Sequence, residues 1–259
     1  VERDSLIEYP ARLVEATELE QDLTLEGAID RLLRAGLDRP AHQKDRPLEI
    51  IEIEEAVKSF DLEKTSKKSA VFDEKKLEWM NGYYIRQLSL EGFSDAVLAY
   101  WEQMKAGGRL SGEQFLPIAP LVQERTKRLG EVWEQVSFFV EEQTYPPLLL
   151  WAGTGDKAAQ RAVASGEDSP LPEDALQLRE WLEATRSRLE ELPAWGEEPL
   201  ETALRALAEE LGVATRRLFG VLRVATTGRT AAPPLFQTMA VLGRDRTLER
   251  IDRAVALVL

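Results

Sequence analysis

Apolar residues recur at spacings of three and four along most of the chain, which is the period of an amphipathic helix. A short run at Leu48–Ile53 could form a strand, but Ile53, Val57 and Phe60 continue it at helical spacing. The pattern therefore predicts an all-α fold. Its clearest stripes are Leu25, Ile29, Leu32 and Leu33; Leu129, Val132, Trp133 and Val136; Leu178, Leu182, Leu189 and Leu192; Leu200, Leu204, Leu207 and Leu211; and Leu248, Ile251, Val255 and Val258.

The periodicity lapses across residues 153–172, where Gly, Ser, Asp and Pro accumulate. Such clusters are typical of loops and linkers. We therefore expect two consecutive helical domains, one over residues 48–168 and one over residues 169–259. Residues 1–47 form an unplaced segment that ends in a short polar connector at 40–47.

Composition narrows the class of protein. The 259 residues contain no apolar run approaching the roughly 18 residues that span a bilayer, so we expect no membrane role. We find no secretory signal pattern either. The absence of cysteine excludes disulfides and thiolate metal sites. These features fit a cytoplasmic protein.

Charge is distributed unevenly. The net charge of −13 argues against a general nucleic-acid or DNA binder. Residues 214–259, however, hold eight arginines against three acidic residues, a local charge of +5, which leaves −18 on the rest of the chain. Such asymmetry could orient an RNA on one face. An ordinary solvated surface would give the same count, so both interpretations stay open at this point.

Two motifs are more specific. Residues 66–86 read SKKSAVFDEKKLEWMNGYYIR, and residues 222–236 read LRVATTGRTAAPPLF. Together and in this order they resemble the carboxy-terminal, anticodon-binding half of bacterial glutamyl-tRNA synthetases. The resemblance implies two helical anticodon-binding domains. Residues 25–37 are similar to the helix that leads into those domains in that family.

The amino-acid-activating half of that family has no counterpart in the sequence. His42 lacks the surroundings of the HIGH-type ATP motif, and Lys64–Lys68 only superficially resembles a KMSKS loop, because it directly precedes the Ala-Val-Phe-Asp block. We therefore expect no catalytic residue, cofactor or metal site in this segment. Whether the segment belongs to an enzyme depends on a catalytic domain elsewhere in the same chain or in another one.

The resemblance assigns Arg86 to the third anticodon base. In that family an arginine at this position goes with forms restricted to tRNA for glutamate, whereas glutamine goes with forms that also accept tRNA for glutamine. Arginine is chemically suited to reading an unpaired base, since its planar guanidinium offers a fixed set of donors and can also stack. A surface ion pair is the ordinary alternative for a single arginine.

Further contacts are implied in the second motif. Arg223 matches another anticodon-contacting arginine, and Pro233 and Leu235 match the positions that line the pocket of the first anticodon base. Ala232 departs from the family pattern because it has no polar side chain, which puts a hydroxyl-mediated base contact in doubt. Contacts with tRNA phosphates are predicted, with lower specificity, for Arg229, Arg244 and Arg250.

The residues of the first motif also predict local structure. Asp73 is a good N-cap for a following helix. Gly82, which is unfavourable inside a helix, either ends that helix or permits close backbone approach. Large apolar side chains are expected in the core rather than at a ligand, namely Phe72, Leu77, Trp79, Met80, Trp101, Trp133 and Trp181.

The sequence leaves two functions open. The first is a non-catalytic tRNA-binding module, part or relative of a glutamate–tRNA ligase, with tRNA for glutamate as its partner. The second is a helical protein–protein adaptor that kept the scaffold and lost RNA binding. Both motif arginines favour the first function, and the acidic body of the chain favours the second.

Overall fold

The regular secondary structure in the described part of the computed structural model consists of helices joined by turns and loops, with no strand among those residues. This confirms the predicted all-α fold. No helix in the described part is long and apolar enough to cross a membrane. The predictions for the helix from Leu25, the Leu48–Ile53 run and Phe72 fall outside the described residues. The structure describes residues 57–59, 73–105, 110–166 and 169–258.

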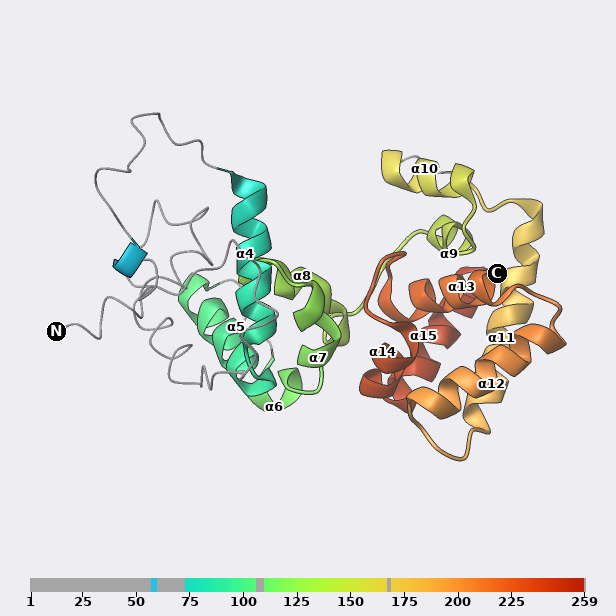
Figure 1. Cartoon of the computed structure of the whole chain (residues 1–259). Helices are drawn as coiled ribbons and strands as arrows, with labels where there is room; N and C mark the ends of the chain where they lie inside the picture. Colours follow the sequence, from blue (N-terminus) through green and yellow to red (C-terminus); the bar gives the residue numbers. More distant parts are fainter. Residues whose placement is uncertain (1–56, 60–72, 106–109, 167–168, 259) are drawn as a thin grey trace. The chain divides into compact units, whose positions relative to one another are not determined.

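The chain divides into two compact units, Val1–Trp133 and Glu134–Leu259. Figure 1 shows the described helices of each unit, coloured along the sequence. The elements of the first unit are α4 (Glu74–Gln87), α5 (Leu90–Met104), α6 (Gly112–Phe115), α7 (Ala119–Val122), η2 (Gln123–Arg125), η3 (Leu129–Glu131) and the start of α8 (Val132–Val136).

Side-chain caps fix the helix ends of the first unit. The carboxylate of Asp73 accepts a hydrogen bond from the Lys76 amide at 3.1 Å, which confirms the predicted N-cap of α4. Ser89 caps α5 in the same way, through a bond from the Gly92 amide at 3.0 Å. Such caps satisfy backbone amides that have no partner within the helix.

Aromatic side chains form the core of the first unit. The Trp101 ring packs edge-on against Phe115 at 5.3 Å and against Trp133 at 5.4 Å, and Phe93 lies 6.0 Å from Phe115. Edge-to-face pairs at these separations contribute more than the burial of their area alone. Trp101 is buried as predicted, whereas Trp133 is only half-buried.

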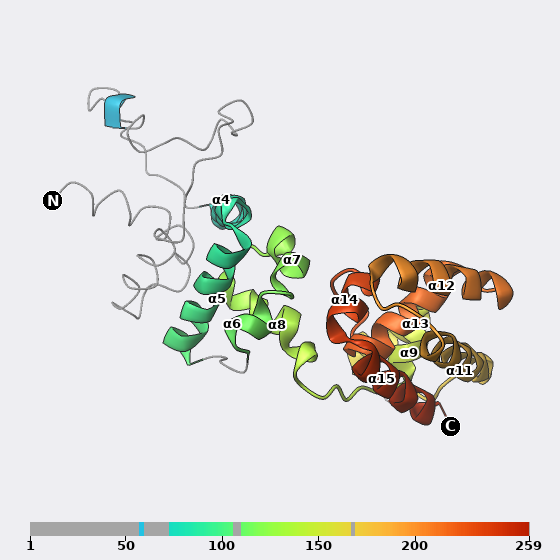
Figure 2. The ribbon, with the colours of Figure 1, turned by 90° about the horizontal axis from the view of Figure 1, so that it is seen from below.

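The second unit is a bundle of longer helices, seen from a second direction in Figure 2. Its elements after α8 are η4 (Ser137–Phe139), α9 (Pro147–Gly153), α10 (Lys157–Ser165), η5 (Glu173–Ala175), α11 (Leu176–Glu190), α12 (Glu197–Glu210), α13 (Thr215–Thr227), α14 (Leu235–Leu242) and α15 (Arg244–Leu257).

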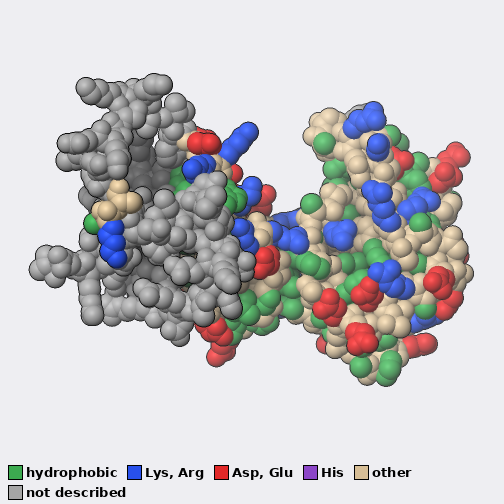
Figure 3. Space-filling model, viewed as in Figure 1, with side chains coloured by type: hydrophobic (Ala, Val, Ile, Leu, Met, Phe, Trp, Pro, Cys, Tyr) green, Lys and Arg blue, Asp and Glu red, His purple; other side chains and the backbone are tan. Residues whose placement is uncertain are grey.

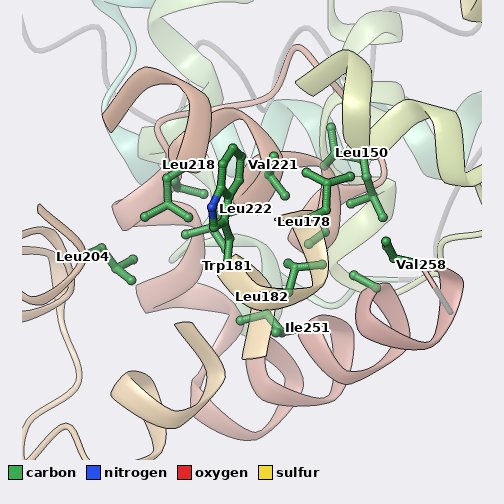
Figure 4. Close-up of a cluster of buried hydrophobic side chains, with 14 of the residues drawn as sticks. Leu150, Leu178, Trp181, Leu182, Leu204, Leu218, Val221, Leu222, Ile251 and Val258 are labelled. Carbon is green, nitrogen blue, oxygen red and sulfur yellow. The ribbon is translucent and has the colours of Figure 1, made fainter. Parts of the chain in front are cut away.

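The bundle's core is assembled from several helices at once. Figure 4 shows Trp181 among leucines, valines and an isoleucine that come from α9, α11, α12, α13 and α15. Leu178, Leu182, Leu222 and Ile251 have no exposed surface. The three C-terminal stripes of the sequence thus point into one core, as amphipathic helices require.

Helices α9 and α10 belong to this same core, which differs from the expected domain boundary near residue 168. Leu150 and Ala159 are members of the buried cluster, and the division between the units lies at Trp133–Glu134. The Gly- and Pro-rich stretch at 153–172 is therefore helical in part. Short helices contain too few residues for periodicity to reveal them.

Two details of the predicted stripes differ in the structure. Leu129 lies in the 3₁₀ turn η3, so the stripe from 129 to 136 does not form a single α-helix, although Leu129, Val132 and Val136 are buried. Trp79 is 38% exposed and was wrongly assigned to the core. Its position on α4 puts it on the opposite face from the buried Leu77.

Helices α9 and α13 approach each other through a pair of glycines. A β-carbon added at Gly220 would lie 1.8 Å from the carbonyl oxygen of Gly153, and one added at Gly153 would lie 2.7 Å from the oxygen of Gly220. No side chain fits at either position, so the two backbones touch directly, and the Val224 side chain also lies close to Gly153.

We expect Gly220→Ala to destabilise the second unit, because the added methyl group must separate two backbones that cannot yield as a side chain would. The expected loss is about 1–3 kcal/mol, the usual cost of overpacking, or more. Urea unfolding followed by circular dichroism measures it. Gly196→Ala is the control, since its new β-carbon would meet only Pro199 Cδ at 3.8 Å. Equal midpoints for the two variants would contradict the contact.

Candidate nucleic-acid interface

Arg86 lies in the last turn of α4, next to a glycine one turn earlier. A β-carbon at Gly82 would be 3.0 Å from Arg86 Nη1 and 3.6 Å from the carbonyl oxygen of Thr126. The helix continues past Gly82 to Gln87. Neither role predicted for this glycine is observed, because the helix does not end there and the nearest backbone atom is at an ordinary contact distance; the Arg86 guanidinium instead lies close to the space that a side chain would take.

The end of α4 is held by Gln123 of η2. The side-chain amide of Gln123 donates to the carbonyl oxygens of Ile85 and Leu88, both at 2.9 Å. These carbonyls close the last turn of the helix, where backbone acceptors lack partners. The turn that carries Arg86 is thus fixed by a buried side chain from elsewhere in the first unit.

Arg86 itself is half-buried and makes no hydrogen bond or ion pair with any described residue. A guanidinium presents five N–H donors in a rigid plane and keeps its charge at any physiological pH. Half-burial without a partner leaves these donors available to an external acceptor. The surface ion pair considered as the alternative is not formed in the described part of the chain.

The remaining predicted base contacts lie in the second unit. Arg223 is half-buried on α13, and that helix ends at Gly228 in a left-handed conformation with φ of 68°. Gly228 thus provides the helix stop predicted from the sequence. Pro233 is buried, and Leu235, the first residue of α14, is only 5% exposed. Their side chains shape the loop before α14, while Thr230, Ala231 and Pro234 are its exposed members.

Four arginines bind the segment by which the chain enters the second unit. Arg229 Nη2 donates to Ser137 Oγ at 3.0 Å, and its Nη1 donates to the carbonyl oxygen of Glu134. Arg246 Nη1 donates to the carbonyl oxygen of Phe139 at 2.9 Å. We call the group of Arg229, Arg246, Arg250 and Arg253 the arginine clamp.

The α15 members complete the clamp. Arg250 donates to the carbonyl oxygens of both Phe138 and Thr226, and Arg253 pairs with Glu142 at 2.8 Å. The spacing of the three α15 arginines shows that they share a helix face. Sequence analysis missed what that face meets, since backbone carbonyls leave no trace in the pattern of side chains.

Two further arginines lie against tryptophan rings. Arg244 donates to the carbonyl oxygens of Glu190 and Leu192 and lies 5.4 Å from the ring of Trp195. Arg217 lies over two tryptophan rings at 5.3 and 5.7 Å. A guanidinium over an aromatic face is attracted by the negative ring surface.

The three arginines predicted to contact phosphate thus already donate to their own chain. Arg229, Arg244 and Arg250 each bond at least one backbone carbonyl. On the face seen in Figure 3, the Lys and Arg side chains of the second unit are interspersed with Asp and Glu. The local excess of arginine near the carboxyl end therefore serves the fold in part, and phosphate binding by these residues stays a prediction.

Burial alters the ionisation of the clamp. It lowers the pKa of Arg250 to about 10, with help from the neighbouring charges of Arg246 and Arg253. Burial also raises the pKa of Tyr145, which the charges of Arg250 and Arg253 partly oppose, to about 12. At neutral pH Arg250 is therefore still a cation and Tyr145 is neutral, so the clamp keeps all its donors.

Comparison with known proteins identifies the family. Residues 92–255 match the model described as "Anticodon binding domain". This chain belongs to the anticodon-binding-domain family. The matched range includes Arg223, Pro233, Leu235 and the clamp, and it begins six residues after Arg86.

Relatives of this anticodon-binding-domain protein are named glutamate–tRNA ligase. The protein from Dehalococcoides mccartyi strain BAV1 is 38% identical over 216 residues, which are 82% of this chain and 41% of that protein. The protein from Roseiflexus sp. RS-1 is 40% identical over 217 residues, 80% of this chain and 38% of that protein. The chain thus spans about two fifths of the length of these relatives.

Solved structures show the same fold. A glutamate tRNA ligase from Elizabethkingia meningosepticum, crystallised with its amino acid, matches with a TM-score of 0.59 and 22% identity. The glutamate-tRNA synthetase of Elizabethkingia anophelis matches equally well. Each comparison covers 90% of this chain and 41% of the other.

We expect Arg250→Ala to lower the free energy of unfolding by roughly 1–3 kcal/mol, because the carbonyl oxygens of Phe138 and Thr226 lose a charged donor. Arg250→Lys should recover only part of this loss, since an ammonium group cannot reproduce the guanidinium fork. Denaturant unfolding by circular dichroism measures both variants. The control is Arg161→Ala, which removes an exposed arginine of α10. If the clamp does not stabilise the fold, Arg250→Ala and the control will unfold at the same denaturant midpoint.

Proposed function

We propose that this anticodon-binding-domain protein binds the anticodon loop of tRNA for glutamate and acts as the tRNA-selecting part of a glutamate–tRNA ligase. The family match and the names of the relatives support the class of partner. The observation that carries the proposal is Arg86, a half-buried guanidinium that no described side chain or carbonyl engages.

Arg86 contrasts with the arginine clamp. A protein that needed Arg86 only for stability would be expected to satisfy it, as it satisfies Arg250 with two carbonyls. Gly82 and Gln123 instead hold the Arg86 turn in place without occupying its donors. An unpaired base presents acceptors on its Watson–Crick and Hoogsteen edges, which such a fork can bind.

The second unit would supply the other contacts. Arg223 is proposed to meet another anticodon base, and the loop shaped by Pro233 and Leu235 would offer backbone groups to the first one. Arg229, Arg244 and Arg250 are proposed to reach phosphates only with N–H groups that their carbonyl contacts leave over. Amino-acid activation would require a catalytic domain in the same chain or in a partner chain.

We expect Arg86→Gln to change the preference between the two tRNAs more than the overall affinity for tRNA. The glutamine amide presents a different donor and acceptor set to the base edge, so the preference for tRNA for glutamate over tRNA for glutamine should fall by about 1–3 kcal/mol. Filter binding with both transcripts measures the ratio of dissociation constants. Arg161→Gln is the control, and it should leave the ratio unchanged. If Arg86→Gln also leaves it unchanged, Arg86 does not read the base.

One observation favours the second candidate function, a protein–protein adaptor without RNA binding. Arg229, Arg244 and Arg250 are committed to backbone carbonyls, which reduces the cationic surface open to phosphate.

A gel-shift assay at low salt separates the two functions. The tRNA-binding module should retard tRNA for glutamate more than a random RNA of equal length, and the complex should weaken steeply with salt, because phosphate contacts release counterions. Retardation of neither RNA would instead support the adaptor, and equal retardation of both would contradict the proposed selection of tRNA for glutamate.

A further inference from the structure

One face of α4 carries two aromatic side chains between two cationic ones. Lys76, Trp79, Tyr83 and Arg86 follow one another at spacings of three, four and three. At 3.6 residues per turn these positions fall within an arc of roughly 80°. We call this set the aromatic–cationic stripe. Of the buried residues of the helix, Leu77, Asn81 and Ile85 lie on the other side, whereas Gly82 borders the stripe beside Arg86.

The aromatic part of the stripe is open and ordered. Trp79 is 38% exposed, and its ring lies 6.3 Å from that of Tyr83 with an angle of 31° between the planes. Tyr84 supports Tyr83 from the side, edge-on at 5.5 Å. Two rings tilted by 31° to each other therefore lie side by side on this face, with Tyr83 held by the neighbouring ring of Tyr84.

The charges around these rings are positive on this face. Lys76 is exposed at one end, and Arg86 stands at the other end without a described partner. The acidic residues of the helix, Glu74 and Glu78, lie outside the arc. Glu78 is turned to Lys127 and Arg128, each at 3.9 Å. The stripe thus fits a ligand that combines flat rings with negative charge.

We propose that the aromatic–cationic stripe is a stacking site for an unpaired RNA base next to the one that Arg86 binds, with Lys76 near its phosphate. The proposal rests on the function proposed above and extends it to residues that neither the family model nor the motif arginines assign. Bases stack on exposed aromatic rings with little regard to sequence. The stripe would increase the affinity for RNA, whereas Arg86 would select the base.

The dimensions of the helix agree with this arrangement. Trp79 and Arg86 are seven residues apart, which is roughly 10 Å along the axis at 1.5 Å per residue. Stacked nucleotides are separated by about 3.4 Å and extended ones by more. A base held at Arg86 therefore places its neighbour over Tyr83 or Trp79.

The test uses the full chain and a transcript of tRNA for glutamate. Trp79→Ala should weaken binding by about 5- to 100-fold, the usual effect of losing one stacked base, and Trp79→Phe should stay within about threefold of the unchanged chain. The slope of log affinity against log salt should be the same for Trp79→Ala, because stacking releases no counterions. Leu90→Ala is the matched control, since Leu90 is also 38% exposed and lies on the neighbouring helix α5.

Tryptophan fluorescence gives an independent readout. RNA should quench the emission of the unchanged chain more than that of Trp79→Phe, because only the former has an indole under the base. This comparison decides the matter even if Trp79→Ala fails to fold. Binding by the unchanged chain with equal quenching in Trp79→Phe would overturn the stacking site and leave the proposed function standing. No binding of tRNA by the unchanged chain would overturn both.

Discussion

The bond between guanidinium and backbone carbonyl is the interaction on which the second unit depends. The segment after Trp133 has only short helical turns, so several of its carbonyl groups have no partner of their own. Arg229, Arg246 and Arg250 satisfy them from the other end of the sequence. A single guanidinium can serve two carbonyls, which explains why arginine rather than lysine fills these positions.

The clamp and Arg86 show two contrasting uses of arginine in the described part of the molecule. In the clamp the acceptors are built into the chain, and the side chains tie α15 and the loop after α13 to the entering segment. On α4 the described residues supply none, and the Arg86 guanidinium lies close to Gly82. Residue type alone does not separate these uses; the distinction comes from what each guanidinium meets in the folded unit.

Much of the fold was predictable because it follows from local pattern. The stripes that end in Leu192, Leu211 and Val258 predicted the helices α11, α12 and α15, and Asp73 predicted the start of α4. The grouping of α9 and α10 was not predictable, since it depends on a backbone contact between Gly153 and Gly220. The position of Arg250 was not predictable either, since its partners are backbone carbonyl oxygens of Thr226 and Phe138. The motif located Arg86, but that no described residue pairs with it is a property of tertiary structure.

Gln123 has a consequence for how such a protein can change over generations. Its amide closes the turn that presents Arg86, although it lies on a different element and faces away from solvent. A substitution there would tilt the guanidinium while every residue on the proposed contact surface stayed the same. Under the proposed role of Arg86, drift in tRNA preference among descendants of this sequence would therefore begin at a site that no comparison of exposed residues reveals.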